Sequence, residues 1–226
     1  MSSSQNASFV SIHCQGILFD MDGILISSIE AVERAWSKWA DVRGVDRELV
    51  MSVMHGRRAI ETVAKTCPDC DPEAELKIIE RFEIEDKDGL KVLPGVPELL
   101  RALPNNRWTV VTSATLGLAR VRLQAGGISV PDHMVTAEHV SRGKPHPEPY
   151  IAGATLLGLR PTECVVFEDS TSGVQAGRAA GCTVIGTTFS HPVESLDAAH
   201  YVVDDLTGVN AEVFAAGLVL RFKPLR

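Results

Sequence analysis

The sequence predicts an α/β fold in which a Rossmann-like, doubly wound parallel sheet carries an inserted domain made of helices. From residue 92 onward, short apolar segments alternate with segments of helical periodicity, as in parallel sheets whose two faces are covered by helices. The apolar run at residues 16–19 is separated from those strands by residues 28–91, where the pattern is helical and no convincing strand occurs. The helical block is therefore predicted to be an insertion after the first strand.

The expected elements follow from these patterns in chain order. The insertion should contain helices at 30–40, 48–54, 57–65 and 72–85. After the break at Pro94 and Gly95, strands are predicted at 109–112, 134–136, 164–167, 183–186 and 201–203, and helices at 96–102, 116–124, 147–157, 172–180 and 196–199. The predicted domains are a tail at 1–14, a core at 15–27 and 92–226, and the helical insertion at 28–91. The basic end at 221–226 is predicted to be solvated.

Composition narrows the class of protein. The chain has 226 residues, 45% of them hydrophobic, and 22 basic against 29 acidic residues give a net charge of −7. Because no basic block occurs, nucleic-acid binding has no electrostatic support. The apolar patch at 9–12 is too short for a signal-peptide core, and no stretch approaches a membrane span. We expect a cytoplasmic protein without nucleic-acid or membrane partners, and a monomer, with a dimer left open.

The five cysteines are odd in number and scattered, which suits a reducing compartment better than a disulfide scaffold. Cys67 and Cys70 form one Cys-x-x-Cys motif. Because no second pair lies nearby, a zinc site or a redox centre is the disfavoured alternative. Two free thiols on a loop between helices are expected.

Chemically distinctive side chains stand where four predicted segments end. The first strand runs into Asp20 and Asp22, and the following Gly23 permits a tight turn. The other ends carry a hydroxyl pair, a lysine between a glycine and two prolines, and a second acidic pair: Thr112 and Ser113, Lys144, and Glu168 and Asp169. Taken singly, each has an ordinary explanation, such as a calcium loop, a helix cap or a solvated lysine.

Together these residues predict one site, because ligands of an open α/β sheet bind at the carboxyl ends of its strands. Carboxylates at Asp20 and Asp169 offer the oxygen ligands that Mg²⁺ prefers, and Mg²⁺ is commonly bound together with phosphate. The metal, Lys144 and a hydroxyl would neutralise a phosphoryl group beside an aspartate nucleophile. The sequence thus favours phosphate-ester chemistry at this edge.

In the order of these motifs the chain resembles the phosphatases of the haloacid dehalogenase superfamily that carry a small helical cap. The resemblance covers nearly all of residues 15–210. Segments 55–58, 143–150 and 165–169 are similar to the branch that contains 2-deoxyglucose-6-phosphate and glycerol-3-phosphate phosphatases. The resemblance implies the superfamily fold, a Mg²⁺ cofactor, a small phosphorylated substrate such as a sugar or polyol phosphate, and hydrolysis through an aspartyl phosphate.

The resemblance also implies a role for each motif residue. Asp20 would attack phosphorus. Asp22 would protonate the leaving oxygen and then activate water, while its backbone carbonyl binds the metal. Asp169 would be a metal ligand, and Glu168 either a ligand or a support for one. Lys144 would hold both the nucleophile and the phosphate.

Substrate contacts are assigned with alternatives. A phosphate oxygen would be bound by Ser113 with the Ala114 N–H, and Thr112 replaces Ser113 if the strand is shifted by one residue. The candidates in the helical cap for contact with the leaving group are His55 and Arg58, with Arg57 behind them. A helix-capping role for these cap residues is equally compatible with the sequence.

Two positions depart from the superfamily pattern. Ile24 stands where many of its phosphatases carry threonine, which leaves the subclass open. Val32 aligns with a cap histidine of the β-phosphoglucomutases, which favours hydrolysis over mutase chemistry. Phosphomutase activity remains the alternative. A non-enzymatic phospho-aspartate receiver is disfavoured by Asp22 and the insertion, and cleavage of carbon–phosphorus or carbon–halogen bonds by the lack of a suitably placed extra cap lysine.

Overall fold

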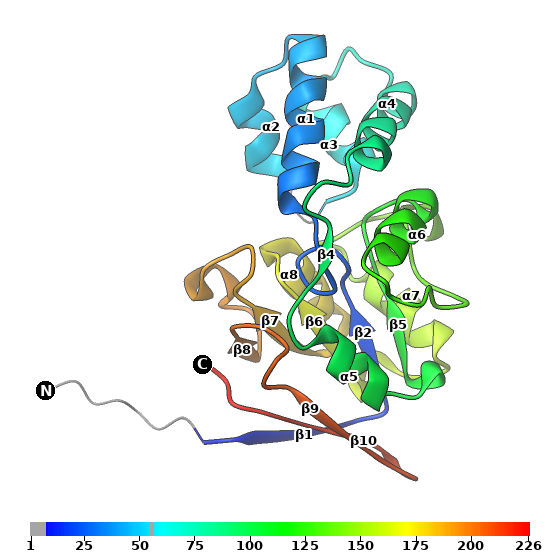
Figure 1. Cartoon of the computed structure of the whole chain (residues 1–226), viewed down its shortest axis with the longest axis vertical. Coiled ribbons are helices and arrows are strands. Elements are labelled where there is room, and N and C mark those ends of the chain that lie inside the picture. Colours follow the sequence, from blue (N-terminus) through cyan, green and yellow to red (C-terminus); the bar gives the residue numbers. More distant parts are fainter. Residues whose placement is uncertain (1–7, 55–56) are drawn as a thin grey trace, which may run out of the picture.

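A five-stranded parallel sheet forms the centre of the protein (Figure 1). The structure is a computed structural model that describes residues 8–54 and 57–226. The strands lie in the order β5-β2-β6-β7-β8. Their bounds are β2 (Gly16–Phe19), β5 (Trp108–Val110), β6 (Cys164–Glu168), β7 (Thr183–Thr187) and β8 (Tyr201–Val203). Because the chain winds outward from β2 in both directions, the ligand-binding crevice of such a fold lies at the carboxyl end of β2.

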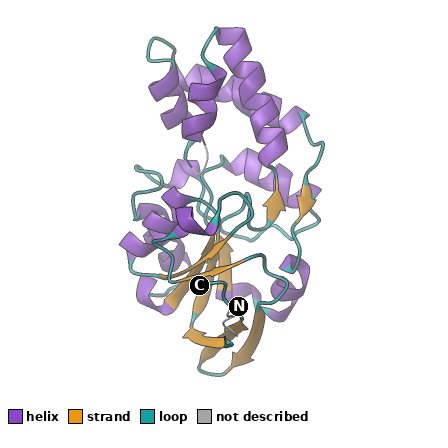
Figure 2. Cartoon of the chain, turned by 90° about the vertical axis from the view of Figure 1, so that its left-hand side faces the viewer, coloured by secondary structure: helices purple, strands orange, loops and turns teal. Residues whose placement is uncertain are grey.

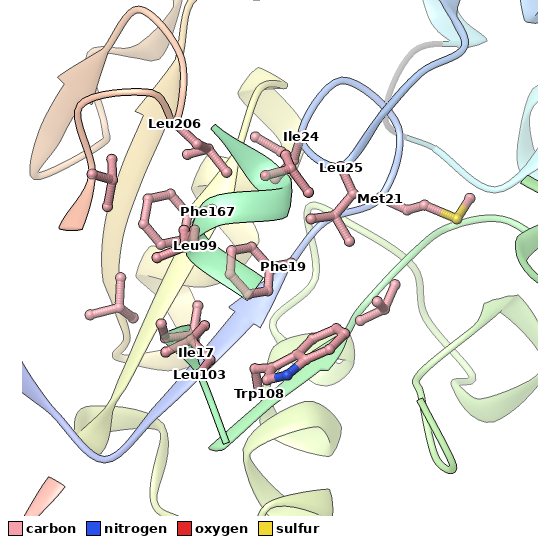
Figure 3. Close-up of a cluster of buried hydrophobic side chains, with 14 of the residues drawn as sticks. Ile17, Phe19, Met21, Ile24, Leu25, Leu99, Leu103, Trp108, Phe167 and Leu206 are labelled. Atoms are coloured by element: carbon pink, nitrogen blue, oxygen red, sulfur yellow. The ribbon is translucent and has the colours of Figure 1, made fainter. Parts of the chain in front are cut away.

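Helices cover both faces of this sheet, which confirms the predicted fold class. They are α5 (Val96–Ala102), α6 (Leu116–Ala125), α7 (Glu148–Leu156) and α8 (Thr171–Ala180), with short 3-10 helices η1 (Asn105–Arg107), η2 (Ala137–His139), η3 (Pro161–Glu163) and η4 (Val193–Leu196). Successive side chains of β2 point to opposite faces. Phe19 packs with Leu99 of α5 and stacks on Phe167, with ring centroids 5.3 Å apart (Figure 3). Leu18 packs instead with Tyr150 of α7.

The predicted helical insertion lies between the short strands β3 (Ile26–Ser27) and β4 (Lys91–Val92), which pair with each other. It consists of α1 (Ile29–Arg43), α2 (Arg47–Met54), α3 (Ala59–Thr66) and α4 (Pro72–Glu85). Figure 2 shows these helices gathered at one end of the molecule, beyond the paired strands. They share a hydrophobic core of their own, which includes Trp36, Trp39, Val50, Val63 and Ile79. We propose that residues 28–91 form a cap domain hinged at β3 and β4.

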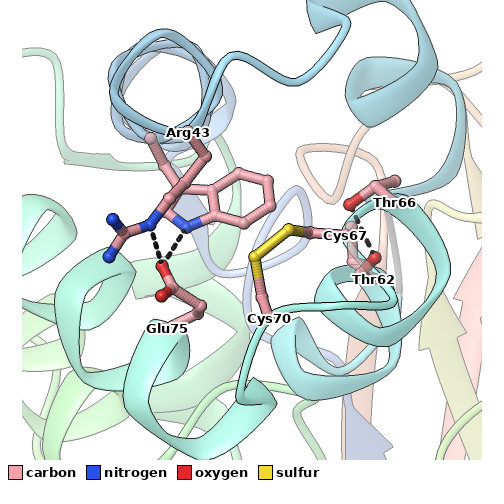
Figure 4. Close-up of a disulfide and its surroundings, with 7 residues drawn as sticks. Arg43, Thr62, Thr66, Cys67, Cys70 and Glu75 are labelled. Atoms are coloured by element: carbon pink, nitrogen blue, oxygen red, sulfur yellow. Dashed lines mark hydrogen bonds and ion pairs between the residues drawn. A yellow bond between two sulfur atoms is a disulfide. The ribbon is translucent and has the colours of Figure 1, made fainter.

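Polar contacts tie α4 to α1 inside this cap (Figure 4). One oxygen of Glu75 accepts hydrogen bonds from Trp39 Nε1 at 2.8 Å and from Arg43 Nε at 2.7 Å. Glu75 is only 6% exposed. The hydrogen bond from Arg43 holds the pKa of Glu75 below its ordinary value. The Glu75 carboxylate therefore links the helices that begin and end the insertion.

Cys67 and Cys70 form a disulfide, so the prediction of two free thiols is wrong (Figure 4). The physical reason is the tight turn between α3 and α4. The Cys70 N–H donates to the Cys67 carbonyl at 3.0 Å, which brings the two Cα atoms to 5.4 Å. This separation lies within the range that a disulfide requires. The other three cysteines, Cys14, Cys164 and Cys182, are free and buried.

A three-stranded antiparallel sheet lies outside the predicted elements. It consists of β1 (Val10–Cys14), β10 (Gly217–Phe222) and β9 (Asn210–Phe214), in the order β1-β10-β9. The predicted tail at 1–14 thus differs from the structure at 10–14. The predicted solvated end at 221–226 is wrong in part, because Phe222 is buried and the Leu225 N–H donates to the Val202 carbonyl at 2.7 Å. The pairing of β1 with β10 joins segments near opposite ends of the sequence, which a local sequence pattern does not reveal.

Two further predicted elements are smaller than expected. The strand at 134–136 is reduced to one parallel bridge between Val135 and Val111, because the chain turns directly into η2. The helix at 196–199 is replaced by η4, four residues long, which ends at Leu196. Among the described residues, none of the helices has the length and apolar character needed to cross a membrane.

Candidate active site

Asp20 follows β2 directly and is 6% exposed. Its N–H donates to the Phe167 carbonyl of β6 at 3.0 Å, which continues the strand pairing up to Asp20. Lys144 Nζ donates to Asp20 Oδ1 at 2.8 Å and to the Val111 carbonyl at 3.1 Å. The structure therefore brings the predicted aspartate and lysine into direct contact across 124 residues of sequence.

Glu168, the last residue of β6, is fully buried beside Lys144. Glu168 Oε1 lies 2.8 Å from Lys144 Nζ and accepts from the Tyr150 hydroxyl at 2.8 Å. Oε2 accepts from the N–H groups of Asp169 and Ser170, each at 2.9 Å. Burial would raise the pKa of Glu168, but the Lys144 ammonium and these hydrogen bonds lower it. Because both oxygens have protein partners, we propose that Glu168 supports Lys144 rather than binding a metal ion.

Asp169 lies next to the turn that follows the first acidic pair. The Ser190 hydroxyl donates to Asp169 Oδ2. Gly23 has φ +80°, and a Cβ added there would lie 1.7 Å from Asp169 Oδ2. Only glycine therefore allows this turn to approach the second acidic pair so closely.

Three buried carboxylates, those of Asp20, Glu168 and Asp169, offer oxygen atoms that lie within 4.8 Å of one another. Burial raises the pKa of Asp20 to about 7, although Lys144 opposes the shift. Burial, together with the neighbouring carboxylates, raises the pKa of Asp169 well above its ordinary value. The cluster thus holds more negative charge than Lys144 compensates. A divalent cation with oxygen ligands supplies the missing charge, so the donor set fits Mg²⁺.

Asp22 lies in different surroundings from Asp20. Its side chain is 29% exposed. Oδ1 accepts from the Ser28 hydroxyl at 2.5 Å, and Oδ2 accepts from Arg122 Nη1 at 2.8 Å. A bridge to Ile26 closes the turn that contains Asp22. The two neighbouring acids can therefore perform different chemical tasks, because environment sets the behaviour of a carboxyl group.

A cavity lies between this sheet edge and the cap, and Asp20, Asp22 and Asp169 line it. The predicted phosphate-binding residues Thr112, Ser113 and Ala114 line it too. Thr112 is 4% exposed, and its hydroxyl accepts from the Ala114 N–H at 3.1 Å. The predicted pairing of Ser113 with the Ala114 N–H therefore competes with an existing hydrogen bond. Because Ser113 is less buried than Thr112 and also lines the cavity, we propose that Ser113 binds phosphate.

The predicted cap contacts separate into two groups. Arg57 lines the cavity. Arg58 instead donates to the carbonyls of Val140 and Ser141, each at 3.0 Å, and to Glu61 at 2.7 Å. Arg58, the N-cap residue of α3, thus ties this helix to the loop that leads to Lys144, and it is not among the residues that line the cavity. Its contact with the substrate stays a prediction. His55 lies outside the described residues.

Three charged residues of the cavity wall were not identified from the sequence, namely Glu80 and Glu83 of α4 and Arg122 of α6. Arg122 of α6 and Glu83 of α4 line the cavity, and Arg122 Nη2 lies 3.4 Å from Glu83 Oε1. Burial raises the pKa of Glu83 to about 7, against the attraction of Arg122. Arg122 lies four residues after the buried Leu118, and Glu83 lies four residues after the buried Ile79. A charge on the apolar face of a predicted helix is the signal that could have revealed them.

At one edge of the parallel sheet, beneath the helical insertion, a cluster of carboxylates that could hold a metal ion lies beside a buried lysine. This arrangement defines an α/β enzyme with a site for a metal ion and an anionic group. The chain belongs to the haloacid dehalogenase-like hydrolases, because the model of that family matches residues 14–181. This membership confirms the family that the motifs indicate.

Curated relatives extend over most of the chain. It is 44% identical over 179 residues to hexitol phosphatase A of Escherichia coli, covering 77% of this chain and 83% of that protein. It is 40% identical over 195 residues to glycerol-1-phosphate phosphohydrolase 2 of Saccharomyces cerevisiae, covering 80% and 78%. It is 33% identical over 217 residues to 2-deoxyglucose-6-phosphate phosphatase 1 of the same yeast, covering 85% and 88%.

Solved structures share the fold. A hydrolase from Pseudomonas syringae superposes with a TM-score of 0.77 at 24% identity, covering 85% of this chain and 94% of that one. A β-phosphoglucomutase from Clostridium difficile gives 0.73 at 23% identity, covering 86% and 92%. Since a hydrolase and a mutase both share the fold, the reaction has to be argued from the site.

Proposed function

We propose that the protein is a Mg²⁺-dependent phosphatase that hydrolyses sugar or polyol monophosphates through an aspartyl phosphate on Asp20. The observation that carries this proposal is the buried Lys144, bonded to Asp20 at 2.8 Å within an acidic cluster of which Asp20 and Asp169 line the cavity. The named activities of the curated relatives, hexitol phosphatase and glycerol-1-phosphate phosphohydrolase, support the same class of reaction.

Asp20 and Asp169 would hold the metal ion through their carboxylates, and Asp22 through its backbone carbonyl. When bound, Mg²⁺ supplies positive charge that keeps Asp20 ionised and offsets the charge of the phosphoryl group. Burial lowers the pKa of Lys144, but its carboxylate partners Asp20 and Glu168 raise it by more, so the net shift is upward and the side chain stays an ammonium. Lys144 therefore orients Asp20 and faces the phosphate with a fixed positive charge.

In the first step an Asp20 oxygen attacks phosphorus and the bond from phosphorus to the leaving oxygen breaks. Asp22 gives its proton to that oxygen, so the product leaves as an alcohol. In the second step Asp22 takes a proton from water, the water oxygen attacks phosphorus, and the bond between phosphorus and Asp20 breaks. Ser113 holds a phosphate oxygen in both steps. The products are inorganic phosphate, the alcohol and the regenerated enzyme.

Hydrolysis is favoured over phosphomutase activity by the cavity wall. Val32, the residue that aligns with the cap histidine of β-phosphoglucomutases, lines the cavity and carries no group that could transfer a proton. Water is then the remaining acceptor for the phosphoryl group. The cap side of the cavity also combines apolar and charged side chains, namely Trp36, Met54, Leu76, Arg57 and Glu80. Such a mixed lining suits the carbon chain and hydroxyl groups of a sugar or polyol.

The experiment that tests this proposal is phosphate release from a panel of hexitol phosphates, glycerol 1-phosphate and 2-deoxyglucose 6-phosphate, with Mg²⁺ and with EDTA. We expect release that requires Mg²⁺ and that is highest for one sugar or polyol monophosphate. The control is Asp132→Asn, an exposed residue outside the cavity lining, which should retain full activity. Failure to release phosphate from any member, or interconversion of phosphate esters without release, contradicts the proposal.

A further inference from the structure

A chain of ion pairs connects the cap to Asp22. Arg122 Nη1 donates to Asp22 Oδ2 at 2.8 Å, while its Nη2 lies 3.4 Å from Glu83 Oε1. The side chains of Arg122 and Glu83 are 5% and 8% exposed. One guanidinium thus contacts an acid of the core site and an acid of cap helix α4 at the same time. Its planar shape and fixed N–H directions suit a bridging role of this kind.

A second contact between α4 and α6 lies beside the Arg122–Glu83 pair, so the two helices share a docking surface. Glu80, one helical turn before Glu83 on α4, accepts a hydrogen bond from the hydroxyl of Thr115, the N-cap residue of α6. The helix α4 therefore meets α6 through two acidic side chains on one of its faces. Both contacts join the cap to the core, and both residues of α4 line the cavity.

We propose that Arg122 is a positioning residue that fixes the Asp22 carboxylate for proton transfer and that it does so together with Glu83 of the docked cap. This inference rests on the proposed function, in which Asp22 protonates the leaving oxygen. A buried arginine whose guanidinium is held by two carboxylates has few alternative orientations. Asp22 is correspondingly held in one place when α4 lies against α6. The docking of α4 against α6 and the positioning of the Asp22 carboxylate are therefore coupled.

The proposal predicts a loss that depends on the leaving group. An alkoxide leaving group needs the proton of Asp22, whereas p-nitrophenolate leaves without it. The ratio kcat/KM covers steps up to the first irreversible one, which is transfer of the phosphoryl group to Asp20. A group that acts only by positioning Asp22 therefore affects kcat/KM for a polyol phosphate and spares p-nitrophenyl phosphate. A merely structural role would lower both.

The test compares Arg122→Met with Arg120→Met, a matched change at an exposed arginine of the same helix. For Arg122→Met we expect kcat/KM to fall on the order of 10² for the best polyol phosphate and less than about threefold for p-nitrophenyl phosphate. Arg120→Met should change neither value, and Arg122→Lys should restore part of the loss. If Arg122→Met does not fold, Glu83→Gln, which keeps the shape of the side chain, should show the same preference to a smaller extent.

A double-mutant cycle separates positioning from direct substrate contact. In the Asp22→Asn background, Arg122→Met should cause no further loss with the polyol phosphate. An equal loss with both substrates, or the full loss of Arg122→Met in the Asp22→Asn background, overturns the proposal. Inactivity of the unmodified enzyme on every phosphate ester would instead overturn the proposed function and this inference with it.

Discussion

Asp20 and Asp22 stand two residues apart, yet only one of them is buried. Asp20 contacts Lys144 within a cluster of acids, whereas Asp22 contacts a hydroxyl and the guanidinium of Arg122. Asp20 continues the pairing of β2 with β6, whereas Asp22 lies in the turn that a bridge to Ile26 closes. The division of labour proposed for the two acids follows from these surroundings.

The raised pKa of Asp20 predicts how the stability of the metal-free protein depends on pH. A carboxyl group whose pKa rises from 3.8 to about 7 on folding favours the folded state at low pH, and this contribution is lost as the pH rises toward 7. Asparagine does not ionise. In EDTA, the free energy of unfolding of Asp20→Asn relative to the unmodified protein should therefore increase between pH 4 and 7 and then level off. Urea unfolding across this range measures it, and a difference that does not change with pH would contradict the assignment.

At the residue scale, sequence reasoning was most successful where a residue type is rare for its position. Acids and a confined lysine at strand ends predicted the contact between Asp20 and Lys144 that the structure contains. It did not identify the partners of Arg58 and Arg122, because the partner of a long, flexible side chain depends on how two separately folded parts meet. Arg58 reaches a core loop, and Arg122 reaches a cap helix.

At the scale of elements, the helices of the cap were predictable because each buries one apolar face at helical spacing. The strand β1 and the strand β10 were not, because they pair with each other from opposite ends of the chain. The strand at 134–136 was overestimated, since a buried apolar run also fits a single bridge followed by a turn. Local sequence patterns therefore predicted the parallel sheet with its helices but did not predict the antiparallel sheet.

The turn between α3 and α4 supports a prediction about its cysteines. Alkylation of the unfolded protein without reductant should modify three cysteines, which are Cys14, Cys164 and Cys182, and alkylation after reduction should modify all five. Because the loop closed by the disulfide is very short, its loss should destabilise the protein by no more than about 2 kcal/mol. Mass spectrometry counts the adducts. Five adducts before reduction would show that the pair is not bonded.

At the scale of the whole molecule, the core and the cap meet in one cavity, and the ribbon of β3 and β4 joins them. The core supplies the acids, the lysine and the hydroxyl, while the cap supplies the wall that faces the leaving group. We propose that the core carries out the reaction and that cap side chains which line the cavity, such as Arg57 and Glu80, select the substrate.

The acidic cluster predicts that a divalent cation stabilises the folded protein. Mg²⁺ at about 100 times its dissociation constant should add about 2.7 kcal/mol, because it binds the folded state only. The shift in Tm should largely vanish in Asp169→Asn and persist in Asp132→Asn, whose side chain is exposed away from the cluster. Differential scanning fluorimetry with and without Mg²⁺ measures it. An unchanged shift in Asp169→Asn would place the ion elsewhere.

Trapping the covalent intermediate shows whether Asp20 carries the phosphoryl group. The enzyme is mixed with its best substrate and Mg²⁺, quenched in acid within the first turnover and reduced with borohydride, which converts an aspartyl phosphate to homoserine. We expect the peptide that contains Asp20 to carry this conversion, and Asp20→Asn to show neither the conversion nor phosphate release. Turnover by Asp20→Asn, or conversion of a different aspartate, would contradict the mechanism.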